Sequence, residues 1–396
     1  MDSVGSPSQP DTTAGPPQAV APQAFAIVAQ HRRENNFDTI RLVAALSVIL
    51  SHAIFIAQGV EINDPLNLLT GNQCMLGLAG VFVFFAVSGF LITQSFEQTQ
   101  SPLRYLIKRV LRIFPAYLVV LVLTAFVLGP IITHLPLSDY FNQADPYRYV
   151  FYNSFFDGRV HDLPGVVFAD NQTGREVNGS LWSLGCEFDM YLMVMVLGML
   201  RLLKLPVCLA LLALGMACIH FPALGVLGGW GWTLSFFASG MVVYRLRETR
   251  LFNRYVALAA LAGLAISIPL RQFILLFPLF GCYLALYVAL HPRLPVIRAT
   301  RFGDLSYGLY IFGWPAEALV MWLLHGQASW WVLFLLAAPL AGGLAFLSWH
   351  LIEKRALRLK PGKAWQGRAL GIRPGTWPVK SLSAATSPSN TGRPSA

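Results

Sequence analysis

The feature that most constrains this chain is a series of apolar runs, each long enough to cross a lipid bilayer as a helix. Crossing roughly 30 Å of hydrocarbon takes about 17–25 helical residues. Only 12% of the residues are charged, against about 25% in ordinary soluble domains. We therefore expect an all-α polytopic integral membrane protein, with the lipid bilayer as the solvent for much of the chain. Ten runs are predicted to span it, at about 37–57, 76–95, 114–133, 179–200, 206–222, 226–244, 254–270, 272–290, 305–325 and 329–352.

The two ends of the chain differ from this membrane domain, which we place at 36–355. Residues 1–35 are rich in Pro, Ser, Ala and Gln, and residues 356–396 are first basic and then rich in Ser and Pro. Such compositions are typical of disordered tails. One long outer loop is predicted at 134–178, and it is acidic and aromatic. Its aromatic residues suit an interfacial belt, the favoured interpretation, or a platform for sugar rings.

The distribution of charge predicts the orientation of the helices. The net charge is +10, but the basic residues sit in short clusters between apolar runs, which argues against a nucleic-acid partner. With both termini in the cytoplasm, 24 of the 29 Lys and Arg residues lie on the cytoplasmic side, as the positive-inside rule requires. The five cysteines show no CxxC pair and no metal-ligand spacing, so we predict no metal site.

Two polar residues in the first run need an explanation, because a charge inside a membrane helix costs about 2.5–3.5 kcal/mol. Arg41 and His52 are eleven residues apart. At 100° per residue they fall within about 20° of the same helical face, roughly 16 Å apart along the axis. Arg binds phosphate in a bidentate manner, and His transfers protons near neutral pH. A snorkelling Arg and a packed His remain an equally weighted alternative from spacing alone.

Ordered motifs add a resemblance to a known family. The R-x10-H spacing of Arg41 and His52 is followed by GVFVFFAVSGFLI (80–92), RYLIKRVLRIFPAY (104–117), NGSLWSLGCEFDMYL (178–192), LSYGLYIFGWP (305–315) and the pair Glu353–Lys354. This ordered set resembles the membrane acyltransferase-3 family, the bacterial O-acyltransferases of surface polysaccharides and related glycans. One position departs from the pattern, because Gly313 stands where the family often has His.

The resemblance implies an activity. It implies that an acyl group, usually acetyl, moves from cytoplasmic acyl-coenzyme A to a hydroxyl of an exported glycan or glycolipid, at the bacterial inner membrane. Acetyl-CoA would be a donor substrate, with no tightly bound cofactor. The chain would be the stand-alone form, without a fused hydrolase-like domain. Neither the acceptor nor the oligomeric state can be predicted from the residues.

Several residues take candidate roles on this basis. Arg109 and Arg112 share a helix face and would bind the donor together with Arg41, although positive-inside anchoring alone would also explain them. His52 would be catalytic, as general base or as an acyl carrier. Glu187, about 12 Å deep in its helix, would orient the His52 ring. Possible acyl or acceptor contacts, for which interhelical hydrogen bonding is the alternative, are Ser88, Tyr117, Trp182, Ser183 and Tyr307.

The main rival is a proton-coupled transporter, which would also use intramembrane His, Arg and Glu. Transporters of that kind are built from inverted repeats, and the two halves of this sequence show no similarity. A lipid-binding sensor without turnover is a weaker rival, because it explains neither the basic cytoplasmic mouth nor Glu187.

Overall fold

The computed structural model describes residues 36–99, 101–156, 160–168, 175–221, 223–224, 228–291 and 303–361. These residues form helices, and their β-structure consists of two isolated bridges, Thr133 to Val166 and Asp162 to Glu176. The predicted all-α class is therefore confirmed for this part of the chain. Nearly all of both predicted tails lies outside the described residues.

Among the described residues, five helical segments are long and apolar enough to span a membrane, which makes the chain a multi-pass membrane protein. They are α2 (Phe37–Gln58), α4 (Leu76–Gln98), Pro102–Ile132, α9 (Trp182–Met199) and Trp330–Arg358. The segment Pro102–Ile132 comprises α5 (Pro102–Leu123), the π-helical turn η2 (Thr124–Leu128) and α6 (Gly129–Ile132). The segment Trp330–Arg358 comprises α16 (Trp330–Ser348), the π-helical turn η5 (Trp349–Glu353) and α17 (Lys354–Arg358). Four further helices are α10 (Leu205–His220), α11 (Gly228–Leu246), α12 (Arg254–Ser267) and α15 (Ser306–Leu323). The count of ten spans and the side on which the termini lie stay predictions.

One predicted helix is wrong, because the run at 272–290 is broken. It forms α13 (Phe273–Leu276) and α14 (Gly281–Leu290), with a turn between them. Pro278 lies in that turn and has no N–H to continue a helix, and its carbonyl accepts a hydrogen bond from Ser239 of α11. The ten residues of α14 extend only about 15 Å.

Other boundaries also shift. The third predicted span starts earlier, at Pro102, because Ser101 caps the helix by accepting from the Arg104 N–H. The basic segment 104–112 is therefore part of α5 and not a loop before it. The predicted outer loop 134–178 contains two short helices, α7 (Leu137–Asn142) and α8 (Asp145–Asn153), and α3 (Pro65–Thr70) lies between α2 and α4.

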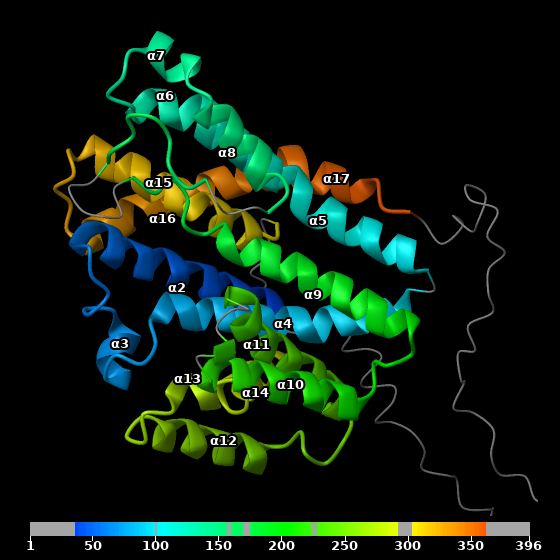
Figure 1. Cartoon of the computed structure of the whole chain (residues 1–396). Helices are drawn as coiled ribbons and strands as arrows, with labels where there is room; N and C mark the ends of the chain where they lie inside the picture. The colour runs from blue at the N-terminus through cyan, green and yellow to red at the C-terminus, as the bar shows by residue number, and fades with distance from the viewer. Residues whose placement is uncertain are drawn as a thin grey trace, which may run out of the picture.

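The helices form a bundle around α2 and α4, which run side by side (Figure 1). Helices α15 and α16 pack on α2, whereas α10 to α14 gather on the other side of α4. Small residues allow these close approaches. A Cβ added to Gly240 of α11 would overlap the carbonyl oxygen of Ala86 on α4.

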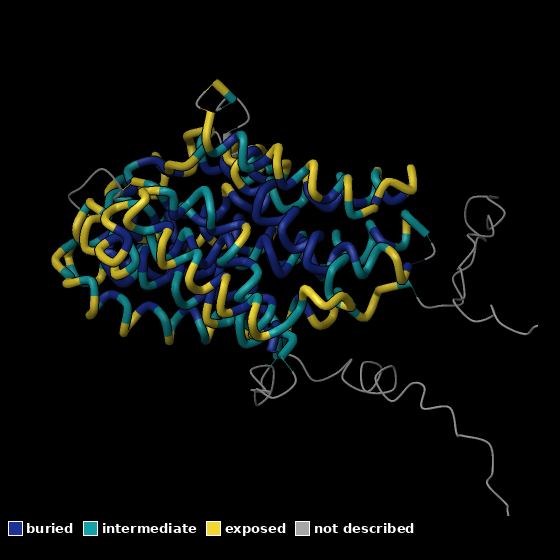
Figure 2. Tube along the Cα trace, turned by 90° about the horizontal axis from the view of Figure 1, so that it is seen from below, coloured by how far each residue is buried: buried dark blue, intermediate teal, exposed yellow. Residues whose placement is uncertain are grey.

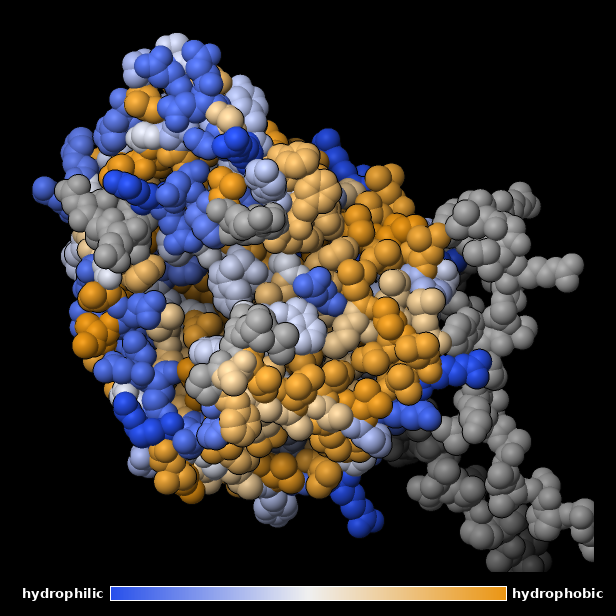
Figure 3. Space-filling model, viewed as in Figure 1, coloured by the Kyte–Doolittle hydropathy of each residue, from blue (hydrophilic) through white to orange (hydrophobic). Residues whose placement is uncertain are grey.

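Buried residues run through the centre of this bundle, and exposed ones lie along its outer faces (Figure 2). Many of the exposed side chains are large and apolar, among them Leu258 and Leu261 of α12 and Leu335 and Leu336 of α16. The surface drawn in Figure 3 carries a broad hydrophobic area over the helices and is more polar toward the end that holds α3 and α7. A soluble protein rarely exposes so much apolar surface, so these faces suit contact with lipid.

Candidate functional site

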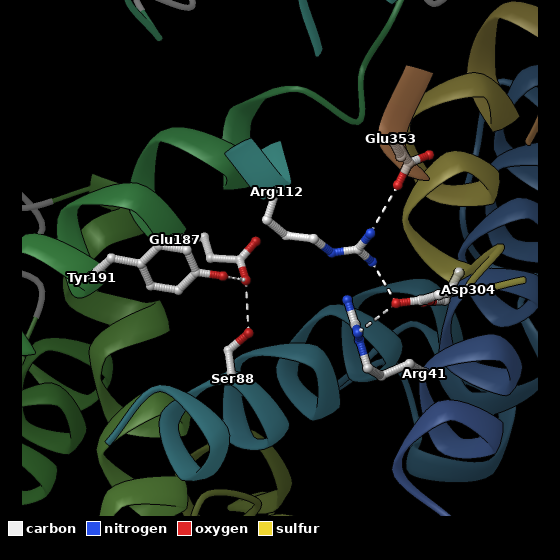
Figure 4. A network of polar contacts seen from close by, with 8 residues as sticks. Arg41, Ser88, Arg112, Glu187, Tyr191, Asp304 and Glu353 are labelled. Carbon is white, nitrogen blue, oxygen red and sulfur yellow. Dashed lines mark hydrogen bonds and ion pairs between the residues drawn. The ribbon is translucent and has the colours of Figure 1, made fainter. Parts of the chain in front are cut away.

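Four charged side chains from distant parts of the sequence meet near the start of α2, and we call them the ion cluster: Arg41, Arg112, Asp304 and Glu353 (Figure 4). Asp304 Oδ2 lies 2.5 Å from Arg112 Nη2 and 3.4 Å from Arg41 Nη1. The other end of the Arg112 guanidinium lies 2.8 Å from Glu353 Oε2. Two cations thus face two anions, and the cluster is close to neutral.

The charge of Asp304 is set by this cluster. Asp304 lies in the segment before α15, and Ser306 donates a hydrogen bond of 2.8 Å to its Oδ1. Burial alone would raise the pKa of Asp304, but Arg41, Arg112 and Ser306 together lower that pKa to about 2. Asp304 is therefore ionised at neutral pH and holds α2, α5 and α15 together.

Glu187 of α9 lies on the same side of the bundle as the ion cluster. Its Oε1 accepts hydrogen bonds from Ser88 of α4 at 2.7 Å and from Tyr191 at 2.5 Å. Glu187 and Arg41 both line a cavity of about 30 Å³ between α2, α4, α9 and α15. That volume holds about two water molecules. The remaining lining residues are Val81, Phe84, Phe85, Ser183, Leu184, Tyr307 and Tyr310.

Arg109 stands apart from the ion cluster. Its Nη2 donates to Ser95 Oγ at 3.3 Å, and its guanidinium lies over the rings of Tyr105 and Tyr191. No described carboxylate forms an ion pair with it. Lys360, just beyond α17, belongs to the same basic region, because burial, Arg109, Arg112 and Lys108 lower its pKa to about 8.

His52 lies in the second half of α2, eleven residues and roughly 16 Å from Arg41 along the helix. The carboxylate that faces it is Glu317 of α15, with Nδ1 and Oε2 3.7 Å apart. Trp314 packs edge-on against the imidazole, with ring centroids 4.7 Å apart. Glu317 is fully buried, whereas 20% of the His52 side chain is exposed.

The structure therefore does not bring Glu187 to His52 as expected. The reason is the depth at which α9 starts. The segment before α9 is already buried at Val177, Asn178 and Ser180, and the Asn178 amide donates to the carbonyl of Ile311 in α15. Because the chain enters the bundle before Trp182, Glu187 is carried past the level of His52 toward Arg41.

The remaining predicted contacts divide into two groups. Ser88, Ser183 and Tyr307 lie at or beside the cavity, where Ser183 Oγ and Tyr310 Oη are 2.6 Å apart and Tyr307 donates to the Ile113 carbonyl. Tyr117 lies elsewhere and donates to the Asn153 carbonyl of α8. Trp182 is 41% exposed at the start of α9, away from the cavity lining.

Gly313 packs directly against α2. A Cβ at this position would lie 2.9 Å from Cγ1 of Ile49, closer than real Cβ atoms come to a neighbour. The absent side chain thus lets α15 approach α2 one turn before Glu317.

Sequence reasoning missed Asp304, Glu317 and Tyr191. Glu317 carries the same signal that singled out Arg41 and His52, a charged residue within an apolar run. Asp304 carries only a weak signal, since it lies between a basic segment and the LSYGLY motif.

Comparisons with known proteins agree with one another. A family model described as an acyltransferase domain, of the acyltransferase-3 type, matches residues 34–350. An O-acetyl transferase of Shigella phage Sf6 is 28% identical over 342 residues, covering 82% of this chain and 96% of the relative. Nodulation protein 10 of Rhizobium leguminosarum bv. viciae is 30% identical over 366 residues, covering 82% of this chain and 94% of the relative. No solved structure matches the chain significantly.

Proposed function

We propose that this chain, which belongs to the acyltransferase-3 family and is an O-acetyltransferase-like acyltransferase, moves an acetyl group from cytoplasmic acetyl-CoA to a hydroxyl of an exported glycan or glycolipid. The observation that supports this most is the arrangement along α2. Basic residues gather near Arg41, and an ionisable pair, His52 and Glu317, lies roughly 16 Å further along the same helix. Donor and acceptor can then meet from opposite ends of the bundle. We place the protein in the bacterial inner membrane, with both termini in the cytoplasm.

The donor's phosphates would bind at the Arg41 end. Arg112 has both ends of its guanidinium on carboxylates, so its main role in this proposal is to hold the ion cluster. Arg41 shares Asp304 at the longer distance of 3.4 Å, and Arg109 has no described carboxylate partner. These two, with Lys108 and Lys360, would supply the positive charge that attracts a phosphorylated donor.

The acetyl group would pass along the cavity between the ion cluster and His52. Its walls are apolar at Val81, Phe84 and Phe85 and polar at Ser183 and Tyr310. Tyr310 lies one turn before Trp314, which contacts His52, so the proposed route continues from this cavity along α15 toward the imidazole.

At His52 the acetyl group is transferred from the sulfur of the thioester to the oxygen of the acceptor. His52 Nε2 takes the proton of the acceptor hydroxyl as its oxygen attacks the thioester carbonyl carbon. A C–O bond forms, the C–S bond breaks, and the proton passes from His52 to the departing thiolate. In the second route, Nε2 itself attacks the thioester carbonyl carbon, the C–S bond breaks and coenzyme A leaves as a thiolate, so that the acetyl group resides on His52. The acceptor oxygen then attacks the acetyl carbon, the C–N bond to His52 breaks, and the hydroxyl proton ends on the thiolate.

The test is transfer of radiolabel from acetyl-CoA in membranes that contain the full chain and their own surface glycans. His52→Ala is expected to lower incorporation at least a hundredfold, while a matched change at the exposed end of α10, His220→Ala, leaves it unchanged. A His52→Ala variant that labels glycans at the wild-type rate would refute the proposal. Label trapped covalently on His52 would favour the second route.

A further inference from the structure

Glu317 is the buried acidic side chain that the reaction as proposed does not yet use. Its side chain is fully buried in α15. Neither carboxylate oxygen has a hydrogen-bond partner among the described residues, and neither does Nδ1 of His52. An isolated carboxylate in an apolar interior costs several kcal/mol. Such a group persists in a protein when it has a function that repays the cost.

The surroundings of the pair leave few other partners for Glu317. His52 is the ionisable group that faces it, at 3.7 Å. The other carboxylates near this end of α2 are engaged elsewhere, since Asp64 accepts from Ser51 and Glu176 forms an ion pair with His161 at 3.8 Å. Trp314, held by a hydrogen bond from its Nε1 to the Glu176 carbonyl, limits the rotation of the imidazole.

The packing of α15 on α2 explains how Glu317 comes so close to His52. Gly313 and Glu317 are one turn apart on α15, as Ile49 and His52 are nearly one turn apart on α2. Because Gly313 has no side chain, Ile49 fills its place and the two helices approach each other. The carboxylate is thus delivered from the neighbouring helix, at the position where α9 was expected to supply one.

We infer that Glu317 is the positioning residue of His52: its carboxylate binds the Nδ1–H of the imidazole, fixes that tautomer and leaves Nε2 free to accept the proton of the acceptor hydroxyl. This inference rests on the proposed function. When Nε2 takes the proton, His52 carries a positive charge that Glu317 stabilises. The proton then leaves Nε2 for the thiolate, so Glu317 ends each cycle as it began. A shortening of the 3.7 Å separation on substrate binding accompanies this role.

The test compares isosteric and shortened variants in the same radiolabelled acetyl-CoA assay. Glu317→Gln is expected to lower kcat about a hundredfold or more, with the KM for acetyl-CoA within twofold of the wild-type value, because the donor's phosphates bind at the other end of α2. Glu317→Asp, which withdraws the carboxylate by one methylene, is expected to retain more activity than Gln. Combining Glu317→Gln with His52→Ala is expected to add nothing to the loss caused by His52→Ala alone.

Elution of each variant as a single species in detergent identifies the folded ones. A folded Glu317→Gln variant with a wild-type rate, beside an inactive His52→Ala, would overturn the role of Glu317 and leave the proposed function standing. Additive losses of activity in the double variant would also overturn it, because replacing a residue that acts only through packing lowers activity independently of His52. An active His52→Ala would instead refute the proposed function itself.

Discussion

Asp304 is predicted to be the residue on which the ion cluster depends most. Its carboxylate is shared by Arg41 and Arg112, and its side chain is only 19% exposed. Asp304→Asn keeps the shape of the side chain but removes the charge. Of the two carboxylates in the ion cluster, only Glu353 would then remain to face the two guanidinium groups.

The size of the effect follows from the lowered pKa of Asp304. A fall from the ordinary 3.8 to about 2 corresponds to about 2.5 kcal/mol of preference for the ionised form in the folded protein. Breaking a buried ion pair by removing one partner typically costs about 3–5 kcal/mol, so 2.5 kcal/mol is a conservative expectation. Each kcal/mol of lost stability lowers Tm by roughly 2–4 °C in domains of 150–250 residues and by less in longer chains. For a loss of about 2.5 kcal/mol in this longer chain, we expect Tm to fall by about 3–5 °C.

The sign of the pH dependence follows from the direction of the shift. Because the pKa of Asp304 is depressed on folding, its contribution is complete above the unfolded value near 4 and is lost as the pH falls through about 2. The difference between Asp304→Asn and wild type should therefore be the same at pH 8 as at pH 6 and should shrink below pH 4. Thermal unfolding in detergent, followed by tryptophan fluorescence, measures it.

Double-mutant cycles provide the control. Coulomb energy falls as the inverse of distance, so at 2.5 Å against 3.4 Å the coupling of Asp304 to Arg112 should exceed its coupling to Arg41 by roughly a third. Equal stability of Asp304→Asn and wild type at pH 7, or stronger coupling to Arg41 than to Arg112, would refute the reasoning.

Two further predictions concern the two ends of α2. Lys360 has a pKa of about 8 and should lose its charge as the pH rises from 7 to 9, so we expect the KM for acetyl-CoA to rise roughly twofold to fivefold over that range. Lys360→Arg should abolish this rise. Steady-state kinetics in which wild type and Lys360→Arg show the same dependence of KM on pH would count against a donor site there. The new side chain in Gly313→His should overlap Ile49, cost about 1–3 kcal/mol of stability and lower acetyl transfer by displacing Glu317. Adding Ile49→Ala should recover part of the stability and part of the activity, measured by unfolding and labelling assays. Full activity of Gly313→His alone would show that the close approach of α15 to α2 is not needed.

Hydropathy placed the first two helices well because burial in lipid demands long apolar runs. The first two predicted helices, 37–57 and 76–95, correspond to α2 and α4 with small shifts. The break within 272–290 had a signal in the sequence, Pro278 followed by Gly281, that the count of apolar residues concealed. The start of α5 at Pro102 was hidden for a different reason, since its first three turns are basic and amphipathic and continue the helix beyond its apolar part.

The site was harder to predict than the helices because the residues that contact one another in it come from helices far apart in the sequence. The cost of a charge in lipid singled out Arg41 and His52, but it does not say which residue faces which. Counting depth from residue 179, the start of the predicted run, assumed that the chain enters the membrane there, and burial from Val177 onward makes that assumption fail. The same cost argument, applied to the run at 305–325, would have singled out Glu317, the one Asp, Glu, Lys or Arg between Leu305 and Leu324.

The three arginines that the sequence grouped as one donor site are thus expected to divide their work. An Arg whose two ends both bind carboxylates has little charge left for a ligand, and Arg112 is in that position. Arg109, three residues earlier on α5, has its guanidinium between aromatic rings and a serine and keeps its charge available. A stable, neutral cluster can fix α2, α5 and α15 relative to one another without repelling the cationic residues beside it. That rigidity matters at His52, because any tilt of α15 against α2 would be felt roughly 16 Å away, where Glu317 must meet the imidazole to within a few tenths of an ångström.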